Sequence, residues 1–193
     1  MRRSFLVAAL ALACGGMSAA TAPASANLIG QGFTATYQVP ALGMVYGPVS
    51  WSPAAFTVGA GQETTGLVES VTSIETDFSA SSLTLRLMTT LFSPTWNPAS
   101  FNGPVFTATS PLGLLAASVA AGTTMAGFDA SRISFTGDEI RINWAGLSYS
   151  SGTVVAIDFA FTAVPEPASL TLFSLGLLGL AAVGRRATRL VPG

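Results

Sequence analysis

The side chains that carry most enzyme chemistry are nearly absent from this sequence. It has no histidine and no lysine, its eight basic residues are all arginines, and its single cysteine is Cys14. Imidazole-bound metals, Ser-His-Asp catalysis and lysine Schiff bases are excluded, because each needs a side chain that is missing. Any enzymatic activity would therefore have to depend on carboxylates.

Two carboxylate pairs have a spacing that could support such chemistry. Glu75 and Asp77 would lie on one face of a strand, where they could act as acid and base or bind Ca²⁺, although such pairs are more often a solvent-exposed face. Asp138 and Glu139 are adjacent and fit a turn. We therefore predict that the protein is not an enzyme and has no catalytic residue, metal site or cofactor. A hydrolase that uses two carboxylates is the least favoured alternative.

Aromatic residues are the candidates for ligand binding. Trp51 in W-S-P and Trp96 in T-W-N-P stand beside prolines, so we expect both in loops, where an indole could stack on a sugar ring. Tyr46 and Tyr149 could assist. The alternative, which we favour, is that these tryptophans close the ends of a hydrophobic core, and Trp144 is expected in the core.

Alternating apolar and polar residues predict the strands that would position these side chains. The pattern covers residues 33–39, 72–78, 83–88, 140–144 and 155–161. Gly137 and Asp138 indicate a hairpin turn after residues 133–135, whereas the apolar run 112–121 fits either a buried strand or a short helix. With many turns and no strong helix, residues 27–163 are predicted to form an all-β fold, a single antiparallel β-sandwich.

The 193 residues leave room for one such domain between two terminal segments. Residues 27–164 contain three arginines and eight Asp or Glu residues, so this part of the chain has a net charge of −5. Phosphate binding requires clustered cations, and none are present here. We therefore expect no nucleic-acid partner.

Residues 1–26 have the order of a secretory signal peptide. Arg2 and Arg3 precede a nine-residue apolar run, which is too short to span a bilayer, and Ala24 and Ala26 mark a small-residue cleavage site. The arginine pair is also similar to a twin-arginine signal, so general and twin-arginine export both remain open. A lipoprotein site at Cys14 is less favoured, because the cleavage site follows it. We expect Cys14 to be removed with the signal.

The C-terminal segment is predicted to enter the membrane. Residues 168–184 carry no charge, and a helix of this length reaches about 26 Å, close to the ~30 Å hydrocarbon core. Arg185, Arg186 and Arg189 follow it. Arginines beyond an apolar helix stay in the cytoplasm, so the domain should lie outside the cytoplasm, attached to the inner membrane through this helix.

The whole segment 164–193 resembles the PEP-CTERM sorting signal. The motif residues are Val164, Pro165, Glu166, Pro167, Ala168 and Ser169, followed by the apolar helix and the arginine cluster. The resemblance implies recognition by an exosortase that removes the helix, in a Gram-negative host that makes exopolysaccharide. Phe101–Phe106, together with the stretch from Met125 to the I-N-W-A-G-L sequence at Ile142, is similar to small secreted β-domains without an established activity that often precede this tail.

These features together predict an exported, non-enzymatic protein. The export machinery and an exosortase would be its processing partners, and its destination would be the cell envelope, the surface or an exopolysaccharide matrix. We expect a structural or surface-interaction role there. The alternative is a polysaccharide-binding module, which would make exopolysaccharide a partner as well.

Overall fold

Residues 27–162 fold into two antiparallel β-sheets in the computed structural model. The predicted signal peptide (1–26) and the predicted sorting segment (164–193), including its apolar helix and arginines, lie outside the described residues. Within residues 27–162, no helix is long and apolar enough to cross a membrane.

Each sheet is formed by strands that are distant in sequence. The five-stranded sheet has the order β3 (Ala55–Thr57), β1 (Gly32–Gln38), β7 (Gly103–Ala108), β10 (Glu139–Ile142) and β9 (Ile133–Phe135). The six-stranded sheet has the order β2 (Val49–Ser52), β4 (Thr64–Val68), β5 (Thr72–Phe78), β6 (Ser82–Thr89), β11 (Thr153–Phe161) and β8 (Leu114–Val119). A short 3₁₀ turn, η1 (Ala130–Arg132), precedes β9.

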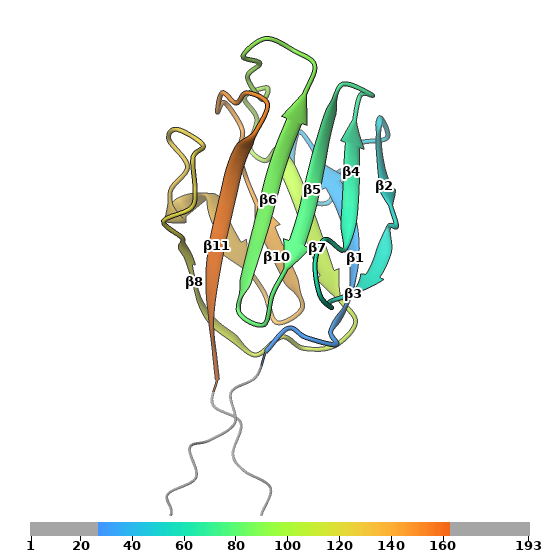
Figure 1. Cartoon of the computed structure of the whole chain (residues 1–193), viewed down its shortest axis with the longest axis vertical. Helices are drawn as coiled ribbons and strands as arrows, with labels where there is room; N and C mark the ends of the chain where they lie inside the picture. The colour runs from blue at the N-terminus through green and yellow to red at the C-terminus, as the bar shows by residue number, and fades with distance from the viewer. Residues whose placement is uncertain (1–26, 163–193) are drawn as a thin grey trace, which may run out of the picture.

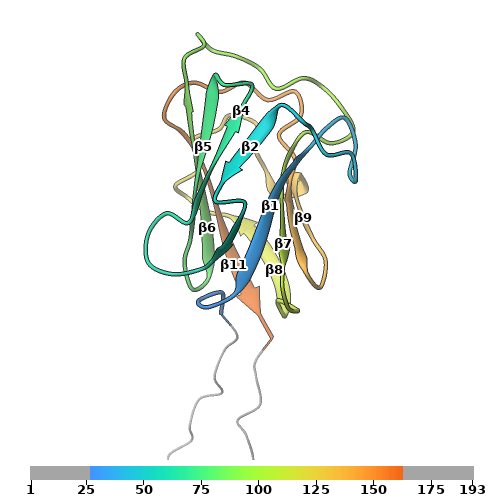
Figure 2. The same cartoon turned by 90° about the vertical axis from the view of Figure 1, so that its right-hand side faces the viewer.

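The two sheets face each other, as Figure 2 shows, and their inward side chains form one core. Ile74 of β5, Leu85 of β6 and Ile157 of β11 are fully buried on one side, and Ile140 of β10 is fully buried on the other. Alternate residues of the same strands face outward, as strand geometry requires. This is the arrangement of a β-sandwich.

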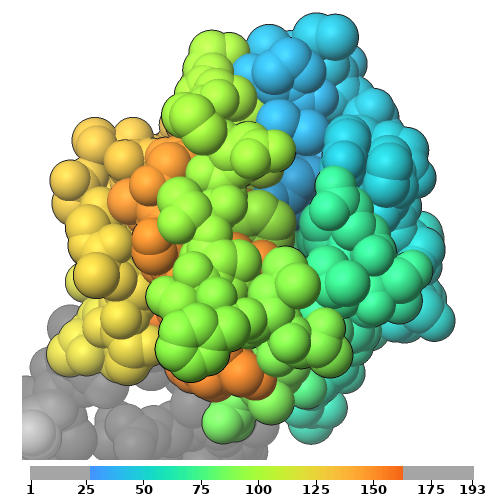
Figure 3. All heavy atoms as spheres, turned by 90° about the horizontal axis from the view of Figure 1, so that it is seen from above, coloured from blue at the N-terminus to red at the C-terminus, as the bar shows by residue number. Residues whose placement is uncertain are grey.

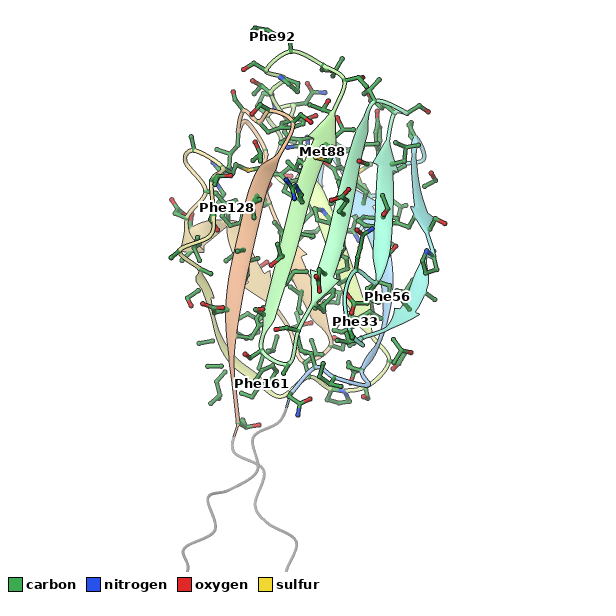
Figure 4. The ribbon with its side chains drawn as sticks, viewed as in Figure 1. Phe33, Phe56, Met88, Phe92, Phe128 and Phe161 are labelled. Atoms are coloured by element: carbon green, nitrogen blue, oxygen red, sulfur yellow. The ribbon has the colours of Figure 1, made fainter. Side chains whose placement is uncertain are left out.

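The domain has two ends, which differ in the loops and chain termini that they contain. Asn27 and Thr162 lie at the same end of the sheets (Figure 1), which we call the proximal end. The opposite end, which we call the distal end, is formed by four loops. They are residues 39–48, 69–71, 90–102 and 143–152, which follow β1, β4, β6 and β10 respectively. Phe92 lies at the distal end and Phe161 near the proximal end (Figure 4).

The segments in which apolar and polar residues alternate were correctly predicted to be strands. The five predicted strands correspond to β1, β5, β6, β10 and β11, and the predicted turn at Gly137 joins β9 to β10. The ambiguous run 112–121 contains the edge strand β8. The four strands β2, β3, β4 and β7 had no prediction, because they are short or interrupted by glycine and proline. The loop prediction for Trp51 is wrong, since this residue pairs with Gly66 between β2 and β4.

Candidate functional site: a cleft at the distal end

Aromatic rings gather under the distal loops. Trp96 stacks on Tyr149 with ring centroids 4.5 Å apart and on Trp144 at 5.1 Å, and Tyr37 is 5.8 Å from Trp96. Tyr46 lies 6.4 Å from Tyr37. All three tyrosines and two of the three tryptophans of the chain therefore belong to this one group, which we call the Trp/Tyr cluster.

Hydrogen bonds fix the inner part of this cluster. The indole N–H of Trp144 donates to the Tyr37 hydroxyl (2.8 Å), which donates to Oδ1 of Asn102 (2.7 Å). The side-chain nitrogen of Asn102 in turn donates to the backbone oxygen of Asn97 (2.9 Å). Burial raises the pKa of Tyr37 far above its ordinary value, so its hydroxyl keeps its proton. Buried polar groups that are all paired hold their rings in one arrangement.

The two sequence stretches noted for their resemblance to secreted β-domains meet at this cluster. The backbone nitrogen of Asn102 donates to Oδ1 of Asn143, and the nitrogen of Trp144 donates to the oxygen of Asn102. A Cβ atom on Gly103 would lie 1.9 Å from the oxygen of Ile142. Only glycine permits this approach of β7 to the end of β10.

The cluster forms one wall of a cleft of about 390 Å³. This volume is near the lower end of the range for small-molecule sites, about 300–1,000 Å³. Side chains from four distal loops and the ends of β1, β4 and β5 line it, among them Tyr46, Glu69, Thr72, Thr95, Trp96 and Asn97. Figure 3 looks onto this end, where the blue to cyan, teal and green segments meet.

Glu69 is the one charged side chain among the described residues that line the cleft. Its carboxylate accepts a hydrogen bond from the Tyr46 hydroxyl, and this bond raises the pKa of Tyr46. Glu69 and Ser70 are the central residues of the tight turn between β4 and β5, with φ of 49° and 60°. The left-handed region is costly for both, at roughly 1–2 kcal/mol per residue.

Strained residues are concentrated at this end. Glu69, Ser70 and Ser93 are the non-glycine residues with positive φ among residues 27–162, and all three lie in distal loops. Strain of this kind persists only where the surrounding structure enforces it, and it is common at binding sites. The backbone nitrogen of Glu69 donates to the oxygen of Pro48 (2.9 Å), which fixes the turn against the loop 39–48.

The structure places three of the four predicted aromatic residues together. Trp96, Tyr46 and Tyr149 all line the cleft, but Trp96 is only 7% exposed and stacks on two other rings. Trp51 lies elsewhere, on β2, where its indole covers Gly66 and contacts Phe106 edge-on at 5.8 Å. The two tryptophans therefore do not form a shared platform. The indole nitrogens of both are buried without a hydrogen-bond partner among the described residues.

The two carboxylate pairs lie outside the cleft. Glu75 and Asp77 share the outer face of β5, with Glu75 directly opposite Arg86 of β6. Glu139 forms an ion pair with Arg141, and Asp138 accepts a hydrogen bond from Thr136 in the turn (3.0 Å). Within residues 27–162, no group of three or more metal-ligating side chains comes together.

Several cleft residues were not identified from the sequence. Tyr37 was recognised only as a strand residue, and Glu69 only as one of eight acidic residues. Asn97 and Asn102 carried no signal of their own, although W-N-P and F-N-G-P place both amides next to aromatic residues in the chain. Only the fold brings these loops together.

The fold places this protein among small all-β domains. Residues 163–186, which begin one residue after the described part ends, match the family model of the PEP-CTERM protein-sorting motif. The chain therefore carries a PEP-CTERM protein-sorting motif. No curated protein and no solved structure matches it.

The matched segment includes the V-P-E-P-A-S residues, the apolar run and Arg185 and Arg186. The motif indicates export, a membrane-anchored precursor and processing by an exosortase toward the cell envelope.

Proposed function

We propose that this protein is displayed at the cell envelope or in the surrounding matrix, where its β-domain acts in surface interaction without catalysing a reaction. The observation that carries the proposal is the sorting motif at residues 163–186, directly after the last strand. In this proposal the β-domain is the part that is exported, and the C-terminal segment is the signal that directs its sorting. The signal peptide predicted at residues 1–26 and the apolar helix predicted at residues 168–184 would be the matching export features.

A non-enzymatic role is supported by how the carboxylates are used. Glu75 and Asp77 face outward from β5, and Glu139 is paired with Arg141. Among residues 27–162, Glu69 is the one carboxylate that lines the cleft, and glycoside hydrolysis by carboxylates uses two. A carboxylate hydrolase is therefore disfavoured.

The geometry supports interaction at the distal end. The described chain ends at Thr162 at the proximal end (Figure 1), whereas the residues that line the cleft belong to the distal loops and the adjoining strand ends. A domain that is attached to the membrane through its proximal end would present the cleft outward. Polysaccharide binding is the second candidate function, and a cleft lined by tyrosines, amides and a carboxylate favours it.

The sorting proposal is tested by substituting Pro165, Glu166 and Pro167 together with Ala. We expect the full-length, membrane-anchored precursor to accumulate, because an exosortase should no longer recognise the extended motif. Immunoblots of membrane and extracellular fractions would measure this. A matched triple substitution of Thr107, Thr109 and Ser110 with Ala, outside the motif, should be processed normally. Normal processing of the motif variant would contradict the proposal.

A further inference from the structure

The distal cleft has an electrostatic preference. Glu69 is its one charged residue among the described lining residues, and no arginine lines it. The remaining polar groups around it include the hydroxyls of Tyr46, Thr72 and Thr95 and the amide of Asn97. A cleft that presents a carboxylate and phenol oxygens without a cation attracts positive charge and repels anions.

Some of these polar groups are used within the protein and others are not. The Thr72 hydroxyl is 2.9 Å from both the Tyr149 and the Thr89 hydroxyls, and Thr95 pairs with Ser148 at 2.7 Å. Glu69 binds Tyr46 through Oε1, and Asn97 accepts through its backbone oxygen. Within the described part of the chain, Oε2 of Glu69 and the side-chain amide of Asn97 are therefore left for a ligand.

The strained turn adds a second reason to single out Glu69. Glu69 has a φ of 49°, a conformation that glycine or asparagine adopts at a lower steric cost. Its carboxylate lies at the cleft. The turn places this one acidic group beside the ring of Tyr46, which is half-buried. An ammonium group that meets a carboxylate next to an aromatic ring gains both charge pairing and a cation–π contact.

The distal end also exposes apolar side chains on two loops. Leu42, Met44 and Val45 lie on one loop, and Leu91 and Phe92 on another, with Phe92 fully exposed (Figure 4). A partner protein could contact them, but nothing in the structure indicates its shape or charge. The cleft itself favours a small ring that carries both an amine and hydroxyls, because Oε2 of Glu69 and the side-chain amide of Asn97 are both left without partners among the described residues. A single lysine side chain would supply only one.

We propose that the distal cleft binds a cationic amino sugar, with its ammonium group on Glu69, its hydroxyls on Asn97 and its ring against Tyr46. The proposal rests on the proposed surface-interaction function and names its ligand class. The volume of about 390 Å³ suits one or two sugar rings rather than a long segment of chain. Neutral sugars would bind more weakly, and sugars that carry a carboxylate would be repelled.

The test is a titration of the full chain, purified in neutral detergent, followed by calorimetry. The probes are oligomers of glucosamine, of N-acetylglucosamine and of galacturonic acid, matched in length. We expect glucosamine oligomers to bind at least about tenfold more tightly than the acetylated ones, since acetylation removes the charge from the amine. Galacturonic acid oligomers should not bind.

Two isosteric substitutions separate the cleft from general surface charge. Glu69→Gln should weaken glucosamine binding about tenfold or more, because it removes the charged acceptor. Glu75→Gln removes the same charge from the outer face of the neighbouring strand, and it should change binding by less than about twofold. Both variants should unfold at the temperature of the unmodified protein within a few degrees.

Three results would overturn the proposal. They are equal weakening by both substitutions, equal binding of the three oligomers, and no binding of any of them. Exosortase processing of Glu69→Gln is followed in parallel and should be normal. A cleft that binds no amino sugar in a protein that is still processed would reject this inference alone. Loss of sorting in the motif variant bears only on the proposed function.

Discussion

The two ends of the core contain different aromatic clusters. A group of phenylalanines, which we call the Phe cluster, lies toward the proximal end, with ring centroids 4.9–6.4 Å apart. It consists of Phe33, Phe56, Phe78 and Phe106. Figure 4 shows Phe33 and Phe56 in this half. The Trp/Tyr cluster occupies the distal half. Strand β1 contributes to both, with Phe33 near its proximal end and Tyr37 near its distal end.

This difference indicates that the phenylalanines at the proximal end mainly stabilise the fold, whereas the aromatic residues at the distal end also shape the candidate site. The phenylalanines have no polar atoms, so they can be buried completely at no hydrogen-bonding cost. The hydroxyls of Tyr37 and Tyr46 bind the side chains of Asn102 and Glu69 in the distal loops, whereas the indole N–H of Trp96 is buried without a partner among the described residues. The Phe cluster therefore stabilises the sandwich, whereas the Trp/Tyr cluster also orients the loops around the cleft.

The largest effect is expected from the Phe cluster. Phe78→Ala should lower the free energy of unfolding by about 3–5 kcal/mol, because it leaves a cavity among three other phenylalanines. Urea denaturation would measure this. Phe92→Ala removes the same ring from a fully exposed position and should change stability by less than about 0.5 kcal/mol. Similar losses in the two variants would contradict the assignment of the core.

A smaller effect is expected from Tyr37→Phe, which keeps the ring and removes only the hydroxyl. The substitution leaves the indole N–H of Trp144 and Oδ1 of Asn102 without their partner, at about 1–3 kcal/mol. Tyr149→Phe should cost less, since Thr72 keeps its bond to Thr89. Urea denaturation of both variants would test the order. A reversed order would show that the buried network does not hold this half together.

The tyrosines make the distal half sensitive to alkaline pH. Burial raises the pKa of Tyr37 and of Tyr149, and the bond to Glu69 raises that of Tyr46. Tyrosines of the unfolded chain titrate near pH 10, so above that pH the unfolded chain loses protons that the folded chain keeps. The free energy of unfolding should therefore fall as pH rises above about 10.

Absorbance of the phenolate and circular dichroism, recorded together, would check this expectation. The sequence has no lysine, so tyrosines dominate titration in this range. Tyr37 should ionise only as the sheets unfold. Ionisation of all three tyrosines near pH 10 with an unchanged spectrum would mean that the cluster is open to solvent.

The smallest effect concerns the strained turn. Ser70→Gly should raise the free energy of unfolding by about 0.5 kcal/mol, because glycine adopts φ 60° without the steric cost that serine has. Ser73→Gly, in the extended strand β5, should instead lower it by about 1 kcal/mol. Thermal unfolding of the two variants would compare them. A loss of stability in both would show that the turn is not strained.

Local chemistry was sufficient to predict much of the framework. Where β1, β5, β6, β10 and β11 alternate strictly, burial of one face decides the conformation, and the pattern can be read directly. Strands β2, β3, β4 and β7 lack this signal. Gly66 is buried because Trp51 lies over it, and Gly103 because the backbone of Ile142 approaches it. Both requirements come from neighbours that are distant in the chain.

The sequence by itself determined the sorting motif, the all-β class and the absence of imidazole and lysine side chains. Each of these depends on a contiguous stretch of residues or on the amino-acid composition, neither of which requires knowledge of the tertiary structure. The tertiary structure alone decided that Glu69, Tyr46 and Asn97 share one cleft. These residues come from the loops that follow β1, β4 and β6. Strand β1 lies in one sheet and strands β4 and β6 in the other, and the packing of the two sheets brings the three loops to the same end.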